Sequence, residues 1–394
     1  MTYRCPICSH DQSTVFVNRP GVPVHQNLLM ASSNAARAVA RGDLILRVCH
    51  GCGFIWNSAF QENLLQYGAD YENTQSCSPA FASHMQELVS RIVDHHGVRG
   101  QTVVEVGCGK GGFISRLIDF PGANNDGYGF DPTYIGEPVA ADGRLRFVNR
   151  FYDSEAASIN ADAVVCRHVI EHVEKPMDLL DAVRSALSAS PTAKVFFETP
   201  CSEWILSNGV IWDFFYEHCS LFSQCSISYA FIRAGFHVTQ VTHVFGGQYL
   251  WVEATVQAAG SASRVALTAA VSRGVPALVE SALKYQQNEK STINQWREWV
   301  VQAAKKGPLA VWGAGAKGCT FVNLVDPDSQ FISAVIDLNA QKVGHFVAGT
   351  GHPIVGIEGL SERGITQAIV MNPNYLSEIR DMLVLRSLNI ELVT

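Results

Sequence analysis

Two pairs of cysteines near the N-terminus have the spacing of metal ligands. Cys5 pairs with Cys8 and Cys49 with Cys52, so each pair places two thiols on one tight turn. Two such turns supply four soft ligands for a tetrahedral Zn²⁺ with no open position, which stabilises a fold and does not catalyse. We therefore predict a structural zinc site. The alternative is four free buried cysteines, and a redox role would need a thioredoxin-like βαβ context that is missing here.

A glycine-rich turn predicts a nucleoside-binding loop. Residues 103–112 read VVEVGCGKGG, a strand-like run followed by Gly107, Gly109 and Gly111. Glycines let the backbone approach a ligand closely, and no Lys-Ser/Thr pair follows them, which excludes the phosphate P-loop. Asp131 ends the next candidate strand, where an acid can accept hydrogen bonds from both ribose hydroxyls. A dinucleotide-binding domain uses the same device, but Glu105 on the first strand favours a different nucleoside.

The run Tyr216-Glu217-His218 is the best candidate for catalysis. It follows the candidate strand at 194–198, and ligands of open α/β sheets bind at the carboxyl ends of strands. His218 could act as the general base that removes a proton from a carbon. Glu217 could orient that base or share in the proton transfer, and Tyr216 could hydrogen-bond a developing enolate oxygen. The alternatives are an aromatic loop that closes a core, or a nucleophile formed by Cys219 beside His218.

Strand-like and helix-like segments alternate over most of the chain, which predicts an α/β fold. Strands are expected at 102–106, 126–130, 163–166 and 194–198, with helices at 113–118 and 175–187 between them. Residues 261–306 read as mostly helical, and further strands are expected at 309–312, 332–336 and 367–371. We predict three domains, at 1–75, 76–260 and 261–394.

The pattern E-x-G-x-G-x-G resembles motif I of class I S-adenosylmethionine-dependent methyltransferases, and residues 163–173 resemble the segment that follows their fourth strand. The resemblance implies a Rossmann-like central domain in which Glu105 supports the loop around the amino-acid part of the cofactor. It also implies a set of cofactor-binding residues: Glu105, Gly107, Gly109, Gly111, Phe130, Asp131, Tyr152, Arg167 and His168. For Glu171 and His172 in the same segment, a hydrogen-bonded helix start is at least as good an interpretation as chemistry.

The order of the parts is similar to that of one group, the three-domain C-methyltransferases that act on nucleotide-linked 4-keto deoxysugars. The shared features are the zinc module, residues 217–222 (EHCSLF), and the C-terminal run VWGAGAKG at 311–318. The resemblance implies a C-terminal Rossmann-like domain that holds a nucleotide-sugar through Gly313, Gly315 and Lys317. Tyr71 is expected to contact the same substrate, with a core or hinge position as its alternative.

The chain departs from this group at one motif. Relatives tend to read Tyr-His-Glu-His where this chain reads Phe215-Tyr216-Glu217-His218. The base is kept, but the acceptor could differ, so O- or N-methylation stays open. An NAD-dependent oxidoreductase that uses residues 312–318, and a scaffold that binds cofactor without catalysis, are the other hypotheses.

Composition narrows the partners. The chain has 394 residues, 47% of them hydrophobic, and a net charge of −7 from 29 basic and 36 acidic residues. This balance disfavours binding to nucleic acid, which needs an excess of Lys and Arg. The N-terminus shows no secretory signal and no apolar run reaches membrane-spanning length. The odd count of 11 cysteines favours reduced thiols, so we expect a cytoplasmic enzyme with a small-molecule substrate.

Overall fold

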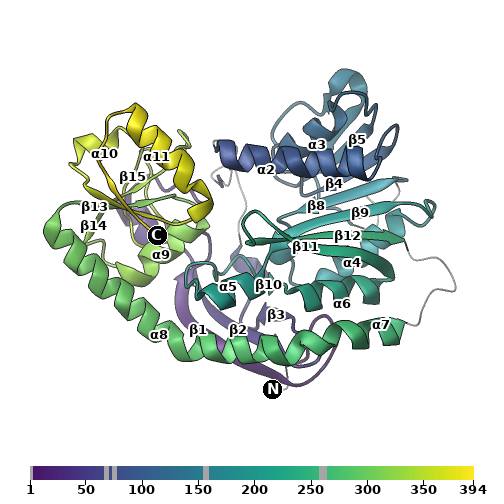
Figure 1. Cartoon of the computed structure of the whole chain (residues 1–394), viewed down its shortest axis with the longest axis horizontal. Coiled ribbons are helices and arrows are strands. Elements are labelled where there is room, and N and C mark those ends of the chain that lie inside the picture. The colour runs from purple at the N-terminus through teal and green to yellow at the C-terminus, as the bar shows by residue number, and fades with distance from the viewer. Residues whose placement is uncertain (1–2, 66–70, 73–77, 154–158, 257–263) are drawn as a thin grey trace.

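A computed structural model describes residues 3–65, 71–72, 78–153, 159–256 and 264–394 (Figure 1). The chain forms three β-sheets, one each in its N-terminal, central and C-terminal parts. Residues far apart in the sequence pair with one another and hold these parts together. The predicted domain boundaries, after residues 75 and 260, lie in the segments 73–77 and 257–263, which are outside the described residues. None of the described helices combines the length and apolar character that a membrane span requires.

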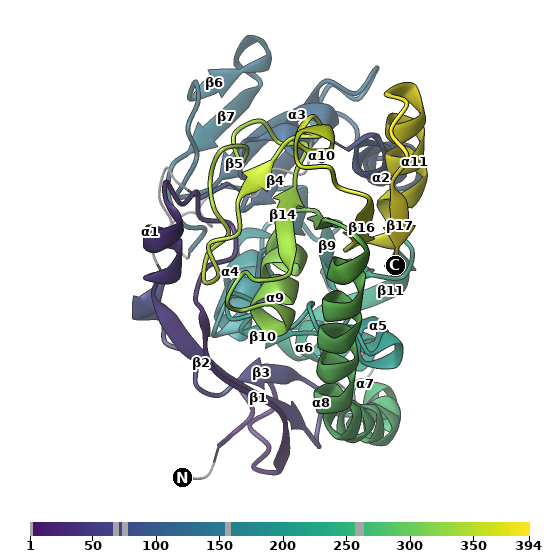
Figure 2. The ribbon, with the colours of Figure 1, turned by 90° about the vertical axis from the view of Figure 1, so that its left-hand side faces the viewer.

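The N-terminal sheet is a long antiparallel hairpin with two short strands added at one edge. Its order is β1 (Ser13–Pro23), β2 (Arg41–Cys49), β3 (Ile55–Asn57) and β10 (Ser220–Leu221). The last strand, β10, comes from the middle of the chain, whereas β3 ends at Asn57. The helix α1 (Ser33–Arg37) lies between β1 and β2 in the sequence. Figure 2 shows the hairpin alongside the C-terminal part. A β-bridge between Met30 of the N-terminal part and Phe346 of the C-terminal part joins the two.

The central sheet has eight strands in the order β11-β12-β9-β8-β4-β5-β7-β6. The parallel strands are β4 (Thr102–Val106), β5 (Asp126–Phe130), β7 (Leu145–Val148), β8 (Ala163–Arg167) and β9 (Lys194–Pro200), and the antiparallel ones are β6 (Val139–Ala140), β11 (Phe236–Val244) and β12 (Tyr249–Val256). The strands predicted at 102–106 and 126–130 are confirmed at both ends, and those at 163–166 and 194–198 extend one and two residues further.

Helices cover both faces of the central sheet, as the continuous apolar strands require. Val103 and Val165 face one layer with α2 (Pro79–Ser90) and α3 (Gly112–Ile118). Val104 faces the opposite layer with α4 (Pro176–Ala186) and α6 (Gln224–Ala234). Because successive side chains of a strand point to opposite faces of the sheet, the side chain at the end of each strand lies on one fixed face, and this decides whether it can contact a ligand.

The C-terminal sheet is parallel throughout, with the order β15-β14-β13-β16-β17. Its strands are β13 (Leu309–Trp312), β14 (Ile332–Ile336), β15 (Ile354–Val355), β16 (Gln367–Val370) and β17 (Glu391–Val393), and its helices are α9 (Ala316–Val325), α10 (Gly359–Glu362) and α11 (Leu376–Leu385). The predicted helical region contains α7 (Arg264–Val271) and the 32-residue α8 (Val275–Lys306). Figure 1 shows α8 running from the central part to the C-terminal sheet, and α5 (Ser202–Asn208) packs on it.

Candidate active site

A cavity of about 290 Å³ lies where the three parts of the chain meet. The N-terminal part contributes Asn27 and Tyr71 to its wall, the central part contributes residues after β8 and before β10, and the C-terminal part contributes its first glycine turn. The carboxyl ends of both parallel sheets therefore face one space, which is where α/β proteins bind ligands.

The predicted cofactor loop has the expected geometry. β4 ends at Val106, and Gly107, Gly109 and Gly111 all have positive φ, at 69°, 54° and 78°. A Cβ on Gly107 would lie 2.1 Å from Cγ2 of Val169, so only glycine fits there. The Gly109 N–H donates to Oδ2 of Asp131 over 2.9 Å. These residues come together as predicted, beside the cavity and not in its lining.

Glu105 supports this loop from beneath. Its Oε2 accepts the Ile114 N–H over 3.0 Å, which ties β4 to the first turn of α3. The carboxyl is 3% exposed, and burial raises its pKa to about 8 in spite of the attraction of Arg167. Glu105 thus links the strand before the loop to the helix after it, and its role toward a cofactor stays a prediction.

Three other predicted cofactor residues lie in packed surroundings. Phe130 and Tyr152 are buried edge to face with ring centroids 5.2 Å apart. The Arg167 guanidinium donates to the Glu198 carboxylate and lies 4.3 Å from the centre of the Phe113 ring. None of the three lines the cavity, because their side chains pack against the two faces of the sheet.

His168 does line the cavity and is held between two carboxylates. Its Nδ1 lies 3.3 Å from Oε1 of Glu171 and its Nε2 lies 3.3 Å from Oε2 of Glu198. Burial opposes protonation, but the two carboxylates outweigh it and raise the pKa of His168 to about 9. The end of β8 therefore carries a cationic imidazole at neutral pH, in a residue with a positive φ of 54°.

His218 and His172 form a pair of imidazoles at the cavity wall. Their ring centroids lie 4.8 Å apart, and Phe215 packs 4.0 Å from the His218 ring. Each Nδ1 is buried without a hydrogen-bond partner among the described residues, as is Oε1 of Glu171. Burial, together with the electrostatic influence of His172, His168 and Lys317, holds the pKa of His218 well below its usual value. His218 is therefore uncharged and able to accept a proton.

Sequence reasoning did not select Glu171 and His172 for chemistry, although the segment that contains them was noted. Ligand atoms of Glu171, His172 and His218 all lie within 4.8 Å of one another, so the group could also hold a metal ion. One signal could have identified them: His172 ends the turn that directly follows strand β8 of the methyltransferase-like part of the chain.

Glu217 and Tyr216 are engaged by the N-terminal part. Oε1 of Glu217 accepts from Nδ1 of His25 over 2.9 Å, and Oε2 accepts the Gln26 N–H over 3.0 Å. The Tyr216 hydroxyl accepts the Gln61 N–H over 2.8 Å, and its ring packs on Phe60 outside the cavity lining. The expectation that Tyr216 reaches a substrate oxygen is therefore corrected, because the loop turns this side chain toward the N-terminal sheet.

The C-terminal glycine turn faces the cavity with all its predicted residues. Gly313, Gly315 and Lys317 line it, as does Tyr71. Nζ of Lys317 donates to Asp213 over 2.8 Å and to Gln248 over 2.9 Å. This lysine is held at the cavity wall by residues of the central part.

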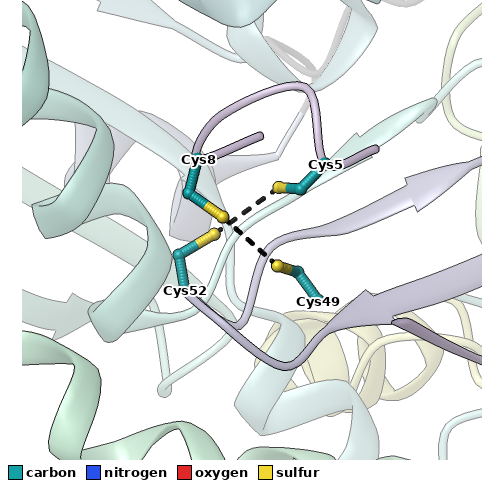
Figure 3. Close-up of side chains that lie close together, drawn as sticks. All are labelled: Cys5, Cys8, Cys49 and Cys52. Carbon is teal, nitrogen blue, oxygen red and sulfur yellow. Dashed lines mark hydrogen bonds between the residues drawn. The ribbon is translucent and has the colours of Figure 1, made fainter. Parts of the chain in front are cut away.

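The four cysteines form one cluster at the base of the N-terminal hairpin (Figure 3). All are free thiols, the Cys5 and Cys52 sulfurs lie 3.6 Å apart, and the Cys8 and Cys49 sulfurs 3.4 Å apart. Tetrahedral Zn²⁺ with bonds of about 2.3 Å places its sulfur ligands about 3.8 Å from one another. The spacing of the thiols fits such an ion.

Family models match two parts of the chain. A methyltransferase domain matches residues 81–241, and a C-methyltransferase C-terminal domain matches residues 254–387. The first range contains the cofactor loop, and the second contains α8 and most of the C-terminal sheet. The central domain is thus a class I, S-adenosylmethionine-dependent methyltransferase domain, followed by a domain found in C-methyltransferases.

Individual relatives are more distant. The tRNA U34 carboxymethyltransferase of Campylobacter curvus is 28% identical over 120 residues, which are 27% of this chain and 37% of that protein. The ubiquinone biosynthesis O-methyltransferase of Stutzerimonas stutzeri is 30% identical over 117 residues, 28% of this chain and 49% of that one. The chain thus spans half or less of these relatives. Among solved structures, a 1,6-didemethyltoxoflavin-N1-methyltransferase from Burkholderia thailandensis aligns with 46% of this chain and with 82% of its own length, at 15% identity. The TM-score of 0.35 is too low for an argument about substrate.

Proposed function

We propose that the chain is a C-methyltransferase that uses S-adenosylmethionine and methylates a carbon α to a carbonyl, in a nucleotide-linked keto-sugar. The observation that carries this proposal is His218, a half-buried imidazole whose pKa is held well below its usual value and whose Nδ1 has no hydrogen-bond partner among the described residues. It lies at the wall of a cavity between the methyltransferase domain and the C-terminal glycine turn. A carbon acceptor needs a base before it can attack, whereas an oxygen or nitrogen acceptor needs less help.

The chain's residues prepare the acceptor carbon. S-adenosylmethionine supplies, when bound, an electrophilic methyl group on a sulfonium. His218 takes the α-proton, and the electron pair of the broken C–H bond forms an enolate whose negative charge lies on the carbonyl oxygen. In this proposal His172, which also lines the cavity beside His218, donates a hydrogen bond to that oxygen. The enolate carbon would then bond to the methyl group as the methyl–sulfur bond breaks, its electron pair staying on the sulfur of S-adenosylhomocysteine, and the proton on His218 would pass to solvent.

The C-terminal turn is suited to the nucleotide part of the acceptor. Backbone N–H groups at the start of α9 favour a diphosphate, and Lys317 adds a fixed positive charge. Tyr71, which also lines the cavity, contacts the sugar in this proposal. Phe215, where relatives have tyrosine, offers a flat apolar face in place of a hydroxyl, so the sugar can differ from theirs.

We infer that the four-cysteine cluster holds Zn²⁺ in a structural role, because four thiolates leave no position open for substrate. Thiols that must stay reduced to bind metal suit the cytoplasm, which is the location we propose.

The reaction is tested by supplying S-adenosylmethionine labelled with ¹³C in its methyl group and a panel of 4-keto nucleotide-sugars. We expect the label in a carbon–carbon bond next to the carbonyl, detected by NMR. A His218→Gln variant should bind S-adenosylhomocysteine with parental affinity in calorimetry and lose at least about a hundredfold in turnover. Label on oxygen or nitrogen, parental turnover of His218→Gln, or binding of NAD(H) in place of S-adenosylhomocysteine would each refute the proposal.

A further inference from the structure

We propose that the four-cysteine module, which is the N-terminal part of the chain at residues 3–65, belongs to the catalytic apparatus because it holds the segment 214–221 that carries His218. Within this module, His25 is a positioning residue for the base. The inference rests on the proposed function of His218. It assigns to the N-terminal module a role in the reaction that is more than stabilisation of its own fold.

Backbone pairing fixes the far end of the segment. Directly after His218, the carbonyl of Cys219 accepts the Asn57 N–H over 2.9 Å. Ser220 and Leu221 then pair with Trp56 and Ile55, so β10 is the fourth strand of the N-terminal sheet. The backbone of the residue next to the base is thus bonded to the N-terminal sheet, while its thiol donates to the Glu171 carbonyl of the central part.

Side chains and carbonyls fix the near end. The Phe214 carbonyl accepts from Nη1 of Arg19 over 3.0 Å, and the Tyr216 hydroxyl accepts the Gln61 N–H. Phe215, Glu217 and His218 line the cavity, and the His218 N–H donates back to the Phe215 carbonyl over 3.2 Å, which closes a tight turn. Most anchors of the segment come from the first 61 residues of the chain, and two come from the central part, where the Glu171 and Val173 carbonyls accept from the Cys219 thiol and the Ser220 hydroxyl.

Glu217 supplies two of these anchors. It is 1% exposed, and its two oxygens accept from Nδ1 of His25 and from the Gln26 N–H. A buried carboxylate is tolerated only when both oxygens are hydrogen-bonded, and removal of one donor leaves an uncompensated charge. The loss of His25 would therefore pull Glu217 from its place, and His218 is the next residue.

The metal ligands lie at the base of the same sheet. Cys49 is the last residue of β2, and β3 begins at Ile55, so the turn that carries Cys49 and Cys52 sets where β3 lies. The Cys49 N–H donates to the Phe54 carbonyl over 2.9 Å within this turn. A metal at the four sulfurs thus fixes the strand on which β10 is paired, and β10 fixes the base.

The inference is tested with two substitutions of His25 in the full-length, metal-loaded chain. His25→Leu removes the donor, whereas His25→Asn keeps an amide nitrogen near the place of Nδ1. We expect His25→Leu to lower kcat about ten- to a hundredfold, because a displacement of 1 Å at a reacting group costs about that much. The KM for acceptor and the Kd for S-adenosylhomocysteine should change less than twofold, and zinc content should stay at one per chain. His25→Asn should recover most of kcat, and His237→Ala, an exposed histidine on β11, is the matched control.

Each result has one meaning. Parental kcat in His25→Leu, or equal losses in His25→Leu and His25→Asn, would overturn the positioning role. If His25→Leu does not fold, Glu217→Gln keeps the volume of the side chain but turns an amide N–H₂ toward one of two donors, and it should lower kcat with unchanged Kd. Parental kcat in Glu217→Gln would also overturn the inference. An active His218→Gln variant would instead refute the base itself, so the two failures are distinguishable.

Discussion

The central and C-terminal parts use the same backbone device. In each, a strand runs into a glycine turn and a helix, and an aspartate after the next strand accepts an N–H of the turn. The Gly109 N–H donates to Asp131 over 2.9 Å, and the Ala314 N–H donates to Asp337 over 2.8 Å. The backbone geometry therefore does not tell the two sites apart.

The side chains around the turns make the difference. The central turn has Glu105, a buried acid, beneath the start of its helix. The C-terminal turn has Lys317 in the first turn of α9, held toward the cavity by Asp213. The acid of the central turn ties the loop to its helix, and the lysine of the C-terminal turn suits a phosphate in the function proposed above. The side chains next to a glycine turn therefore distinguish two turns that share one backbone geometry.

The largest effects should come from adding a methyl group to each turn. A Cβ on Gly107 would meet Val169 at 2.1 Å and one on Gly318 would meet the Gly313 carbonyl oxygen at 1.9 Å. Gly107→Ala should weaken S-adenosylhomocysteine binding about a hundredfold or more and spare the nucleotide-sugar, and Gly318→Ala should do the reverse. Calorimetry with each ligand measures both, and thermal unfolding checks the fold. Loss of the same ligand in both variants would break the comparison.

The two lysines of the turns provide an intermediate test. Lys317→Met should raise the KM for the nucleotide-sugar about tenfold or more and leave the Kd of S-adenosylhomocysteine unchanged, because a fixed charge-assisted hydrogen bond is lost. Lys110→Met is the matched variant in the central turn, where the lysine is 58% exposed and paired with Glu72. It should change either constant less than about fivefold, since the Lys110 ammonium pairs with Glu72 and Lys110 does not line the cavity. Equal effects of the two variants would contradict the distinction.

The smallest effect concerns pH and Glu105. The pKa of this buried carboxyl is raised from an ordinary 4.5 to about 8, so between these values the folded chain holds a proton that the unfolded chain releases. Stability must then fall as pH rises through this window. Glu105→Gln keeps an acceptor for the Ile114 N–H but cannot titrate. Urea unfolding at pH 5 and pH 8 should show a smaller loss of stability in the variant than in the parent, and equal losses would show that Glu105 does not titrate in this way.

Regular elements could be read from the sequence because they depend on local patterns. The apolar runs at 102–106 and 126–130 form strands with the expected ends, and each glycine turn follows such a strand. The four cysteines come together because two tight turns leave few other arrangements.

The orientation of the His218 segment could not be read in the same way. Which of Phe215, Tyr216 and Glu217 faces the cavity depends on the pairing of β10 with β3, a contact between residues far apart in the sequence. His25 has no local signal at all, because its partner Glu217 is 192 residues away. A role for His172 could not be predicted for a related reason. Its Nδ1 is buried beside His218 only because two loops that are far apart in the sequence lie together in the fold.

The central claim is that His218 removes a proton from the acceptor before any methyl group is transferred. The most direct measurement is exchange of the acceptor's α-proton in D₂O without S-adenosylmethionine, followed by NMR. We predict that the parental enzyme replaces one carbon-bound proton next to the carbonyl by deuterium, and that His218→Gln does not. Exchange at the parental rate in His218→Gln would contradict the account.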